Sequence, residues 1–131
     1  MNLLTTDGRR ITSASSDGVG ERLNALYDRF ADNPGAHAWR SGATIATTTM
    51  PHLGAWPEWL GQARALGVGS VLTAVLKTQE RRLGYLLAFS VDAKPFSLSE
   101  AAVFAEFARD AAYRIAERQL GSNILPAKVV A

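Results

Sequence analysis

Two apolar, β-rich runs separated by a short polar break constrain this chain most strongly. Residues 69–77 (Gly-Ser-Val-Leu-Thr-Ala-Val-Leu-Lys) and 82–91 (Arg-Leu-Gly-Tyr-Leu-Leu-Ala-Phe-Ser-Val) flank the break at 78–81. Two such runs across a tight break are typical of an antiparallel hairpin. Because both runs are apolar at consecutive positions, we expect both faces of the hairpin to be covered and its strands to lie at the centre of a sheet.

Side-chain alternation divides this hairpin into two faces. A turn centred on Gln79 and Glu80 would place the bulkier side chains together on one face, namely Leu72, Ala74, Tyr85, Leu87 and Phe89. The opposite face carries smaller residues, including Gly84 and Ala88. Small side chains permit close approach, so we expect a helix to pack on this second face.

The remaining segments alternate between short strands and helices. Strands are expected at 2–6, 10–15 and 43–49, the last as an edge strand, and helices at 21–30, 36–40 and around 59–66. Ser97-Leu-Ser-Glu100 is a capping box, which predicts a long helix from 97 to about 119. Together the segments predict an α+β fold, a central antiparallel sheet of about five strands with helices on both faces.

Apolar periodicity predicts which side of the long helix is buried. Its expected buried stripe is Phe104, Phe107, Ala108, Ala111 and Ile115. Gly121 and Pro126 indicate a frayed tail after the helix. We therefore expect a single domain over 1–120 followed by a C-terminal tail at 121–131.

Composition excludes several classes of function. The 131 residues fit one domain, and the formal net charge of +2 is mild. The chain has no cysteine, which excludes disulfides, thiolate metal sites and thiol catalysis. The pairs Arg9-Arg10 and Arg81-Arg82 fall at expected hairpin tips, where arginines are usually solvated. No apolar run reaches the length of a membrane span. We expect a cytoplasmic protein that binds neither nucleic acid nor membrane.

The sequence offers little for catalysis. His37 and His52 are the only histidines, and neither has a partner at the spacing of a metal or catalytic motif. Either could be a surface or loop residue; the less common alternative, an axial haem ligand, is implied only by the family resemblance described next. We expect no enzyme activity, no metal and no cofactor.

Three segments resemble the core of GAF domains, which share a PAS-like architecture. They are Ala65-Leu-Gly-Val-Gly-Ser-Val-Leu-Thr-Ala-Val-Leu76, Leu83-Gly-Tyr-Leu-Leu-Ala-Phe-Ser90 and Phe96-Ser-Leu-Ser-Glu100. In addition, Asn33-Pro-Gly-Ala-His-Ala-Trp-Arg-Ser-Gly42 is similar to a short helix of actinobacterial GAF domains, including those fused to RNA-binding ANTAR modules. The resemblance implies a small-molecule pocket opposite the terminal helices, dimerisation through those helices, and a role in signal transduction or transcription regulation.

The chain departs from the family pattern at three places. The usual N-terminal helix is missing, which would leave apolar surface beside the C-terminal helix. No effector module follows Gln119, so signalling would pass to a separate protein. Leu87 stands where many members carry a polar residue facing the pocket, which suggests an apolar ligand or a filled core.

Two functional hypotheses follow. The first is a sensory domain that binds a small apolar or aromatic ligand and signals through its C-terminal helix and a homodimer. The candidate ligand-binding residues are Trp39, Thr47, His52, Trp56, Trp59, Leu72, Ala74, Tyr85, Leu87 and Phe89. The second hypothesis is an interaction module whose own side chains fill the pocket and which acts only by pairing.

Overall fold

The computed structural model describes residues 1–49 and 55–130, with side chains described up to residue 119. Its elements follow in this order: β1 (Asn2–Leu4), β2 (Arg10–Ser13), α1 (Gly18–Arg29), α2 (Pro34–Ser41), β3 (Ile45–Thr48), α3 (Pro57–Ala65), β4 (Ser70–Lys77), β5 (Arg82–Ser90) and α4 (Leu98–Val130). The five strands form one antiparallel sheet in the order β2-β1-β5-β4-β3.

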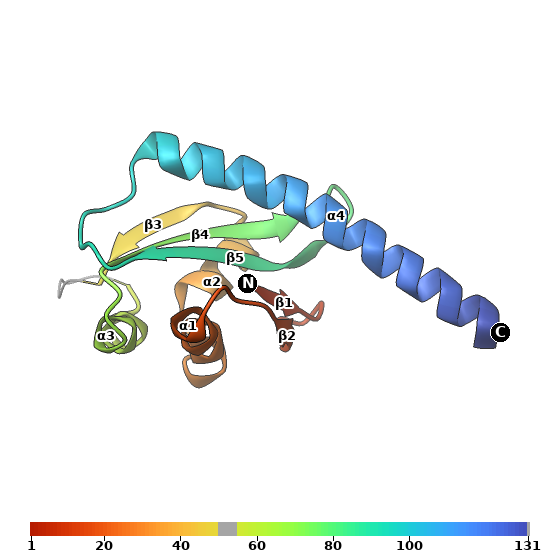
Figure 1. The fold of residues 1–131 in the computed structure, drawn as a ribbon, viewed down its shortest axis with the longest axis horizontal. Helices are drawn as coiled ribbons and strands as arrows, with labels where there is room; N and C mark the ends of the chain where they lie inside the picture. Colours follow the sequence, from red (N-terminus) through yellow and green to blue (C-terminus); the bar gives the residue numbers. More distant parts are fainter. Residues whose placement is uncertain (50–54, 131) are drawn as a thin grey trace.

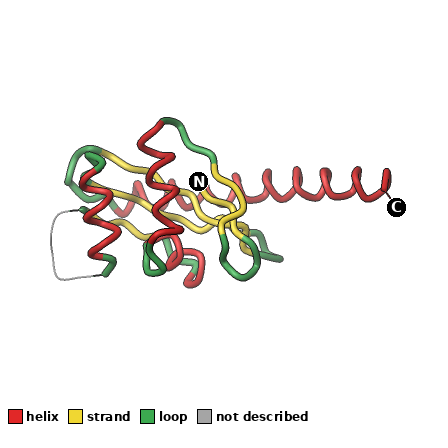
Figure 2. Tube along the Cα trace, turned by 90° about the horizontal axis from the view of Figure 1, so that it is seen from below, coloured by secondary structure: helices red, strands yellow, loops and turns green. Residues whose placement is uncertain are grey.

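Helices cover both faces of this sheet. Figure 1 shows α4 lying along one face and α1, α2 and α3 on the other, and Figure 2 shows the α1–α3 side from below. The arrangement confirms the predicted α+β class, with the central hairpin inside the sheet and β3 at one edge. No helix in the described ranges is both long enough and apolar enough to cross a membrane.

Side-chain caps fix where the helices begin. The backbone N–H of Gly20 donates to Asp17 at 2.8 Å at the start of α1, and that of Ala36 donates to Asn33 at 2.8 Å at the start of α2. Before α4, the N–H of Ser97 donates to the Glu100 carboxylate at 2.8 Å, and the N–H of Glu100 donates to Ser97 Oγ at 3.1 Å. This reciprocal pair confirms the predicted capping box.

The register of the central hairpin differs from the predicted one by one residue. Lys77 pairs with Arg82, but the next pair is Leu76 with Gly84, so Leu83 is an extra residue on β5. Because of this bulge, every later residue of β5 pairs with a β4 residue one position away from the predicted partner. Tyr85, Leu87 and Phe89 therefore lie opposite Val75, Thr73 and Val71. The prediction that Leu72 and Ala74 share the face of Tyr85 is wrong, because alternation turns them towards α4.

Two apolar clusters hold the layers together. The cluster between the sheet and α1–α3 contains Leu23, Leu26, Trp59, Leu60, Ala63, Val68 and Val71. The cluster under α4 contains Ala74, Leu76, Leu83, Ala108 and Ala112. Small alanines at the centre of α4 let that helix approach the sheet closely, as the sequence predicted.

α4 differs from its prediction in two respects. Phe107 was expected in the buried stripe but is 62% exposed, because Ala108 and Ala112 contact the sheet and Phe107 lies on the flank. The helix also extends to Val130, past the predicted end near Gln119. A single glycine such as Gly121 lowers helix stability by only about 1 kcal/mol relative to alanine, which does not force a helix to end.

Candidate functional site

The predicted ligand-binding residues fall on both faces of the sheet. Trp39 belongs to α2, and Trp56 and Trp59 to the start of α3, on the same side as Tyr85, Leu87 and Phe89. Thr47 pairs with Val71 and so lies on this side as well. Leu72 and Ala74 lie on the opposite face, under α4. His52 lies outside the described residues.

The centre of the predicted pocket is filled by the chain's own side chains. Trp59 and Tyr85 are each 1% exposed, and Trp56, Leu87 and Phe89 pack against the same apolar cluster. The Tyr85 ring lies against Gly35 so closely that a Cβ atom at position 35 would overlap it. This face is therefore a packed core at its centre.

A hydrogen-bond network fixes the Tyr85 hydroxyl. Asn2 Nδ2 donates to Tyr85 Oη at 2.7 Å and to the carbonyl oxygen of Asn24 at 2.9 Å. The Tyr27 ring lies 5.7 Å from the Tyr85 ring. Burial raises the pKa of Tyr85 far above its usual value, so its phenol stays neutral. The network ties β1, α1 and β5 together.

Three buried polar side-chain atoms in this region have no hydrogen-bond partner within the part of the chain that the structure describes. They are Asn2 Oδ1, Trp39 Nε1 and Thr73 Oγ1. Thr73 pairs with Leu87 and so lies on the α1–α3 face. Buried polar groups are normally satisfied, so these atoms are available for a bound water or ligand.

One part of the predicted site stays accessible, a hollow of about 230 Å³ between the end of α1 and the start of α3. It is lined by Arg29, Phe30, Ala31, Asp32, Trp56, Pro57 and Glu58. Trp56 adopts a left-handed backbone conformation with φ of 59°. The ring of His37 lies 5.6 Å from the Trp56 ring, in an edge-on arrangement. Trp56 thus combines a strained backbone with an aromatic ring at the hollow, and this ring could stack against a flat ligand.

A larger groove of about 700 Å³ runs past the edge of β4, between α4, the end of α2 and the β4–β5 turn. It is lined by Gly42, Thr44, Ala74, Val75, Lys77, Thr78, Gln79, Glu80, Arg81, Arg82, Ala105, Arg109 and Tyr113. Sequence reasoning missed this groove, apart from Ala74, because its walls come from separate segments. The signal that could have indicated it was the Arg81-Arg82 pair.

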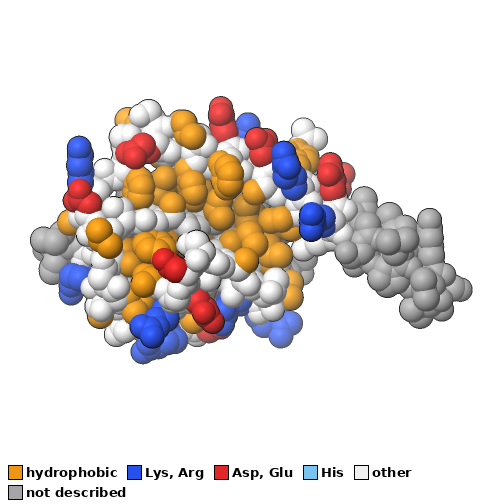
Figure 3. All heavy atoms as spheres, in the orientation of Figure 1, with side chains coloured by type: hydrophobic (Ala, Val, Ile, Leu, Met, Phe, Trp, Pro, Cys, Tyr) orange, Lys and Arg blue, Asp and Glu red, His pale blue; other side chains and the backbone are white. Residues whose placement is uncertain are grey.

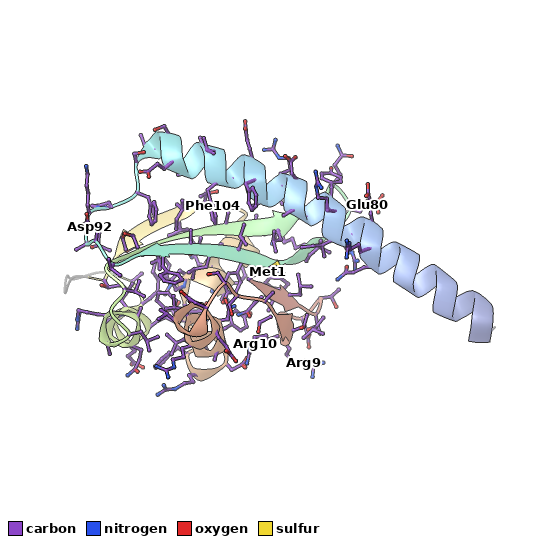
Figure 4. The ribbon with its side chains drawn as sticks, viewed as in Figure 1. Met1, Arg9, Arg10, Glu80, Asp92 and Phe104 are labelled. Atoms are coloured by element: carbon purple, nitrogen blue, oxygen red, sulfur yellow. The ribbon has the colours of Figure 1, made fainter. Side chains whose placement is uncertain are left out.

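Both arginines of that pair hold neighbouring elements rather than pointing only into solvent. Arg82 donates to the carbonyl oxygens of Trp39 at 2.9 Å and Arg40 at 2.7 Å, at the end of α2. Arg81 donates to Gln119 of α4. Figure 4 shows Glu80, in the same turn, beside α4. The turn is therefore attached both to α2 and to α4.

The second arginine pair, next to the β1–β2 turn, is matched by carboxylates. Arg10 forms an ion pair with Asp28 at 2.6 Å, and Arg9 forms one with Asp7 at 3.2 Å. Figure 4 shows Arg9 and Arg10 together at this end of the sheet. Their charge is largely compensated locally. Among the described side chains, no group of three or more His, Asp or Glu could hold a metal ion.

α4 presents apolar side chains on the flank next to β5, which we call the α4 flank: Val103, Phe104, Phe107, Ala111 and Ile115. Val103 is 68% exposed and Phe107 62% exposed, and the other three are partly buried. Met1, Leu3 and Leu86 continue this surface across β1 and β5. Figure 3 shows the resulting apolar band beneath α4, and Figure 4 shows Phe104 pointing from α4 towards the sheet.

The sheet edge beside this flank is only partly covered. β1 pairs with β5 at Gly84 and Tyr85 only, whereas β5 continues to Ser90. From Leu86 onward the outer edge of β5 has no strand beside it in the described ranges. Unpaired edges beside apolar surface favour association with another chain.

Comparison with known proteins gives one structural likeness. No protein-family model matches the chain, and no curated protein matches it either. The fold is similar to the crystal structure of a domain from a protein assigned as a two-component sensor histidine kinase of Sinorhizobium meliloti. The TM-score is 0.62 at 15% sequence identity, over 93% of this chain and 80% of the other. At this identity the likeness supports the fold.

Proposed function

We propose that this chain is a non-enzymatic sensory or regulatory domain that acts through α4 and a homodimer. The fold is shared with a domain of a protein assigned as a sensor histidine kinase, and the sequence resembles GAF domains. Both point towards signalling. A fold hosts many functions, so the residues on the surface must carry the argument.

The α4 flank is the observation that carries this proposal. Large exposed apolar side chains that form a continuous band mark interaction surfaces on soluble proteins. Val103 and Phe107 lie one turn apart on α4, and the band continues onto β5. A second copy related by a two-fold axis would place the same flank against it, because a symmetric dimer uses one self-complementary surface.

The same helix is suited to transmit a signal. α4 contacts β4 and β5 in the middle of the sheet, and it continues beyond the sheet to Val130 (Figure 1). A change that shifts α4 relative to the sheet would alter the dimer and the far end of the helix together. Ligands act on such systems by favouring one of two arrangements. The recipient of the signal would be a separate protein or module.

A second candidate function is binding of a small apolar or aromatic ligand on the α1–α3 face. The hollow at Trp56 and the unpartnered polar atoms of Trp39 and Thr73 favour it. Against it, about 230 Å³ is below the 300–1,000 Å³ of typical ligand pockets, and Trp59 and Tyr85 fill the centre. The packed core on the α1–α3 face therefore favours the other hypothesis, an interaction module that acts only by pairing.

Cysteine cross-linking tests the dimer. The chain has no cysteine of its own, so a single introduced thiol reports one position. Arg114 lies seven residues after Phe107, on the same side of α4. We expect Arg114→Cys to form a covalent dimer on mild oxidation, and Thr12→Cys, on the exposed strand β2, to remain monomeric. Equal cross-linking of both variants would contradict a specific α4 interface.

Thermal melting with indole tests the ligand candidate. An aromatic molecule that binds the folded state raises the melting temperature by mass action. If indole binds at the hollow, the shift should disappear in Trp56→Ala and persist in Leu98→Ala, a change at a residue of α4 that is 91% exposed. If millimolar indole does not shift the melting temperature, the ligand candidate is rejected, and the chain is an interaction module that acts only by pairing.

A further inference from the structure

The groove between α4 and the β4–β5 turn concentrates the positive charge of the chain. Four cationic side chains line it, Lys77, Arg81, Arg82 and Arg109, against the single carboxylate of Glu80. Four positive charges and one negative charge give the lining a formal net charge of +3, which exceeds the +2 of the whole chain. A hollow lined by one sign of charge attracts ligands of the opposite sign.

Two of the four cations are already engaged with neighbouring elements. Arg82 donates to carbonyl oxygens at the end of α2, and Arg81 donates to Gln119. Lys77 and Arg109, in contrast, form no ion pair or side-chain hydrogen bond within the described part of the chain. They belong to different walls, Lys77 to β4 and Arg109 to α4, so one ligand between them could contact both.

Local backbone geometry makes room for the lysine. Gly42, the C-cap of α2, has φ of 76°, and a Cβ atom there would lie 3.2 Å from Lys77 Nζ. A larger residue at this position would displace the ammonium group. The ammonium group also lies near the carbonyl end of α2, where a positive charge interacts favourably with the helix dipole.

The size and surface of the groove fit a small molecule. Its volume of about 700 Å³ lies within the range of typical ligand pockets, about 300–1,000 Å³. Ala74 and Ala105 provide a floor of small side chains, and Tyr113, 42% exposed, adds an aromatic surface. Arginine and lysine are the side chains that bind phosphate groups most commonly in proteins.

We propose that this groove binds a small phosphate-bearing polyanion, held by Lys77 on one wall and Arg109 on the other. The ligand would connect β4 to the side of α4 that carries Ala105, Arg109 and Tyr113. This side faces away from the α4 flank, so binding does not require the proposed dimer. It would strengthen the attachment that Arg81 and Gln119 already make between the turn and α4. The proposed site is also separate from the hollow at Trp56, with which it shares no lining residue.

Isothermal titration calorimetry with tripolyphosphate tests this proposal. We expect binding at low salt that weakens as ionic strength rises. The double variant Lys77→Gln/Arg109→Gln should weaken binding at least about tenfold, because it removes two charge-assisted contacts. The matched control is Arg22→Gln, an exposed arginine of α1 on the other side of the sheet, which should bind like the original chain. Circular dichroism melting confirms that each variant folds.

A comparison of ATP with tripolyphosphate shows whether the groove recognises a nucleotide or the phosphate chain alone. ATP that binds more tightly than tripolyphosphate would identify a nucleotide, with its base near Tyr113, and equal affinities would identify the phosphate chain alone. The proposal is overturned if tripolyphosphate does not bind at millimolar concentration, or if Arg22→Gln weakens it as much as the double variant. It is also overturned if a single-stranded oligonucleotide binds far more tightly through the same residues, which would indicate a nucleic-acid surface.

Discussion

Gly84 of β5 lies directly against Asn2 of β1. A Cβ atom at position 84 would overlap the carbonyl oxygen of Asn2 and lie 2.9 Å from Cα of Leu3. The pairing of β1 with β5 depends on this contact, since Asn2 and Leu3 are the β1 residues that face Tyr85 and Gly84. The glycine therefore joins the N-terminal hairpin to the central one.

Gly84→Ala should consequently be strongly destabilising. Backbone must move to accommodate the new methyl group, and such overpacking costs about 1–3 kcal/mol in the free energy of unfolding. Gly18→Ala, at the start of α1 where nothing lies within 4 Å, should change it by less than about 0.5 kcal/mol. Urea denaturation of both variants measures the difference, and similar stabilities would show that β1 does not press on β5.

The Tyr85 hydroxyl should make the protein sensitive to alkali. Burial raises the pKa of Tyr85 above the value of 10.0 of an exposed tyrosine. The folded state thus holds its proton more tightly than the unfolded state, and this contribution is complete below pH 10 and is lost as the pH rises further. Stability measured against pH should fall above this point, with tyrosinate absorbance appearing as the chain unfolds.

Tyr85→Phe provides the comparison for this pH dependence. It should remove most of the alkaline loss and cost about 1 kcal/mol at neutral pH, because Asn2 Nδ2 loses an acceptor. Tyr113→Phe, at a partly exposed position on α4, should retain the loss. If the Tyr85→Phe variant loses stability in alkali as the original chain does, burial of the phenol is not the cause.

Leu87→Trp distinguishes a filled α1–α3 face from an open pocket. Because the cluster around Trp59 and Val71 is packed, the larger ring should lower the free energy of unfolding by about 1–3 kcal/mol. Leu98→Trp, at a residue that is 91% exposed, should change it by less than about 0.5 kcal/mol. Chemical denaturation measures both. Unchanged or increased stability for Leu87→Trp would reveal unfilled space next to β5.

Local signals predicted most of the fold. The central hairpin and the Ser97–Glu100 capping box depend on residues near one another in the sequence, and both are confirmed. The register was wrong because it is set by a bulge at Leu83, where β5 must also accommodate β1. That contact spans most of the chain, and no local pattern encodes it.

The candidate sites were less predictable, because each combines distant segments. Strand alternation correctly placed Tyr85, Leu87 and Phe89 opposite α4, but it could not show that Tyr85 lies against Gly35 and fills the centre. The cationic groove joins residues near 42, 77 and 109, which only the packed fold brings together. The exposure of Phe107 depends on a small rotation of α4 about its own axis, which a broad apolar stripe does not fix.

The mass of the particle in solution tests the central claim most directly. Sedimentation equilibrium of the original chain should give about twice the 14.1 kDa of one chain. The variant Val103→Glu/Phe107→Glu places two carboxylates on the α4 flank at positions that are already exposed, so it should fold normally but sediment as a monomer. A monomeric original chain at high concentration, or a double variant that remains dimeric, would contradict the proposal that this domain acts by pairing through α4.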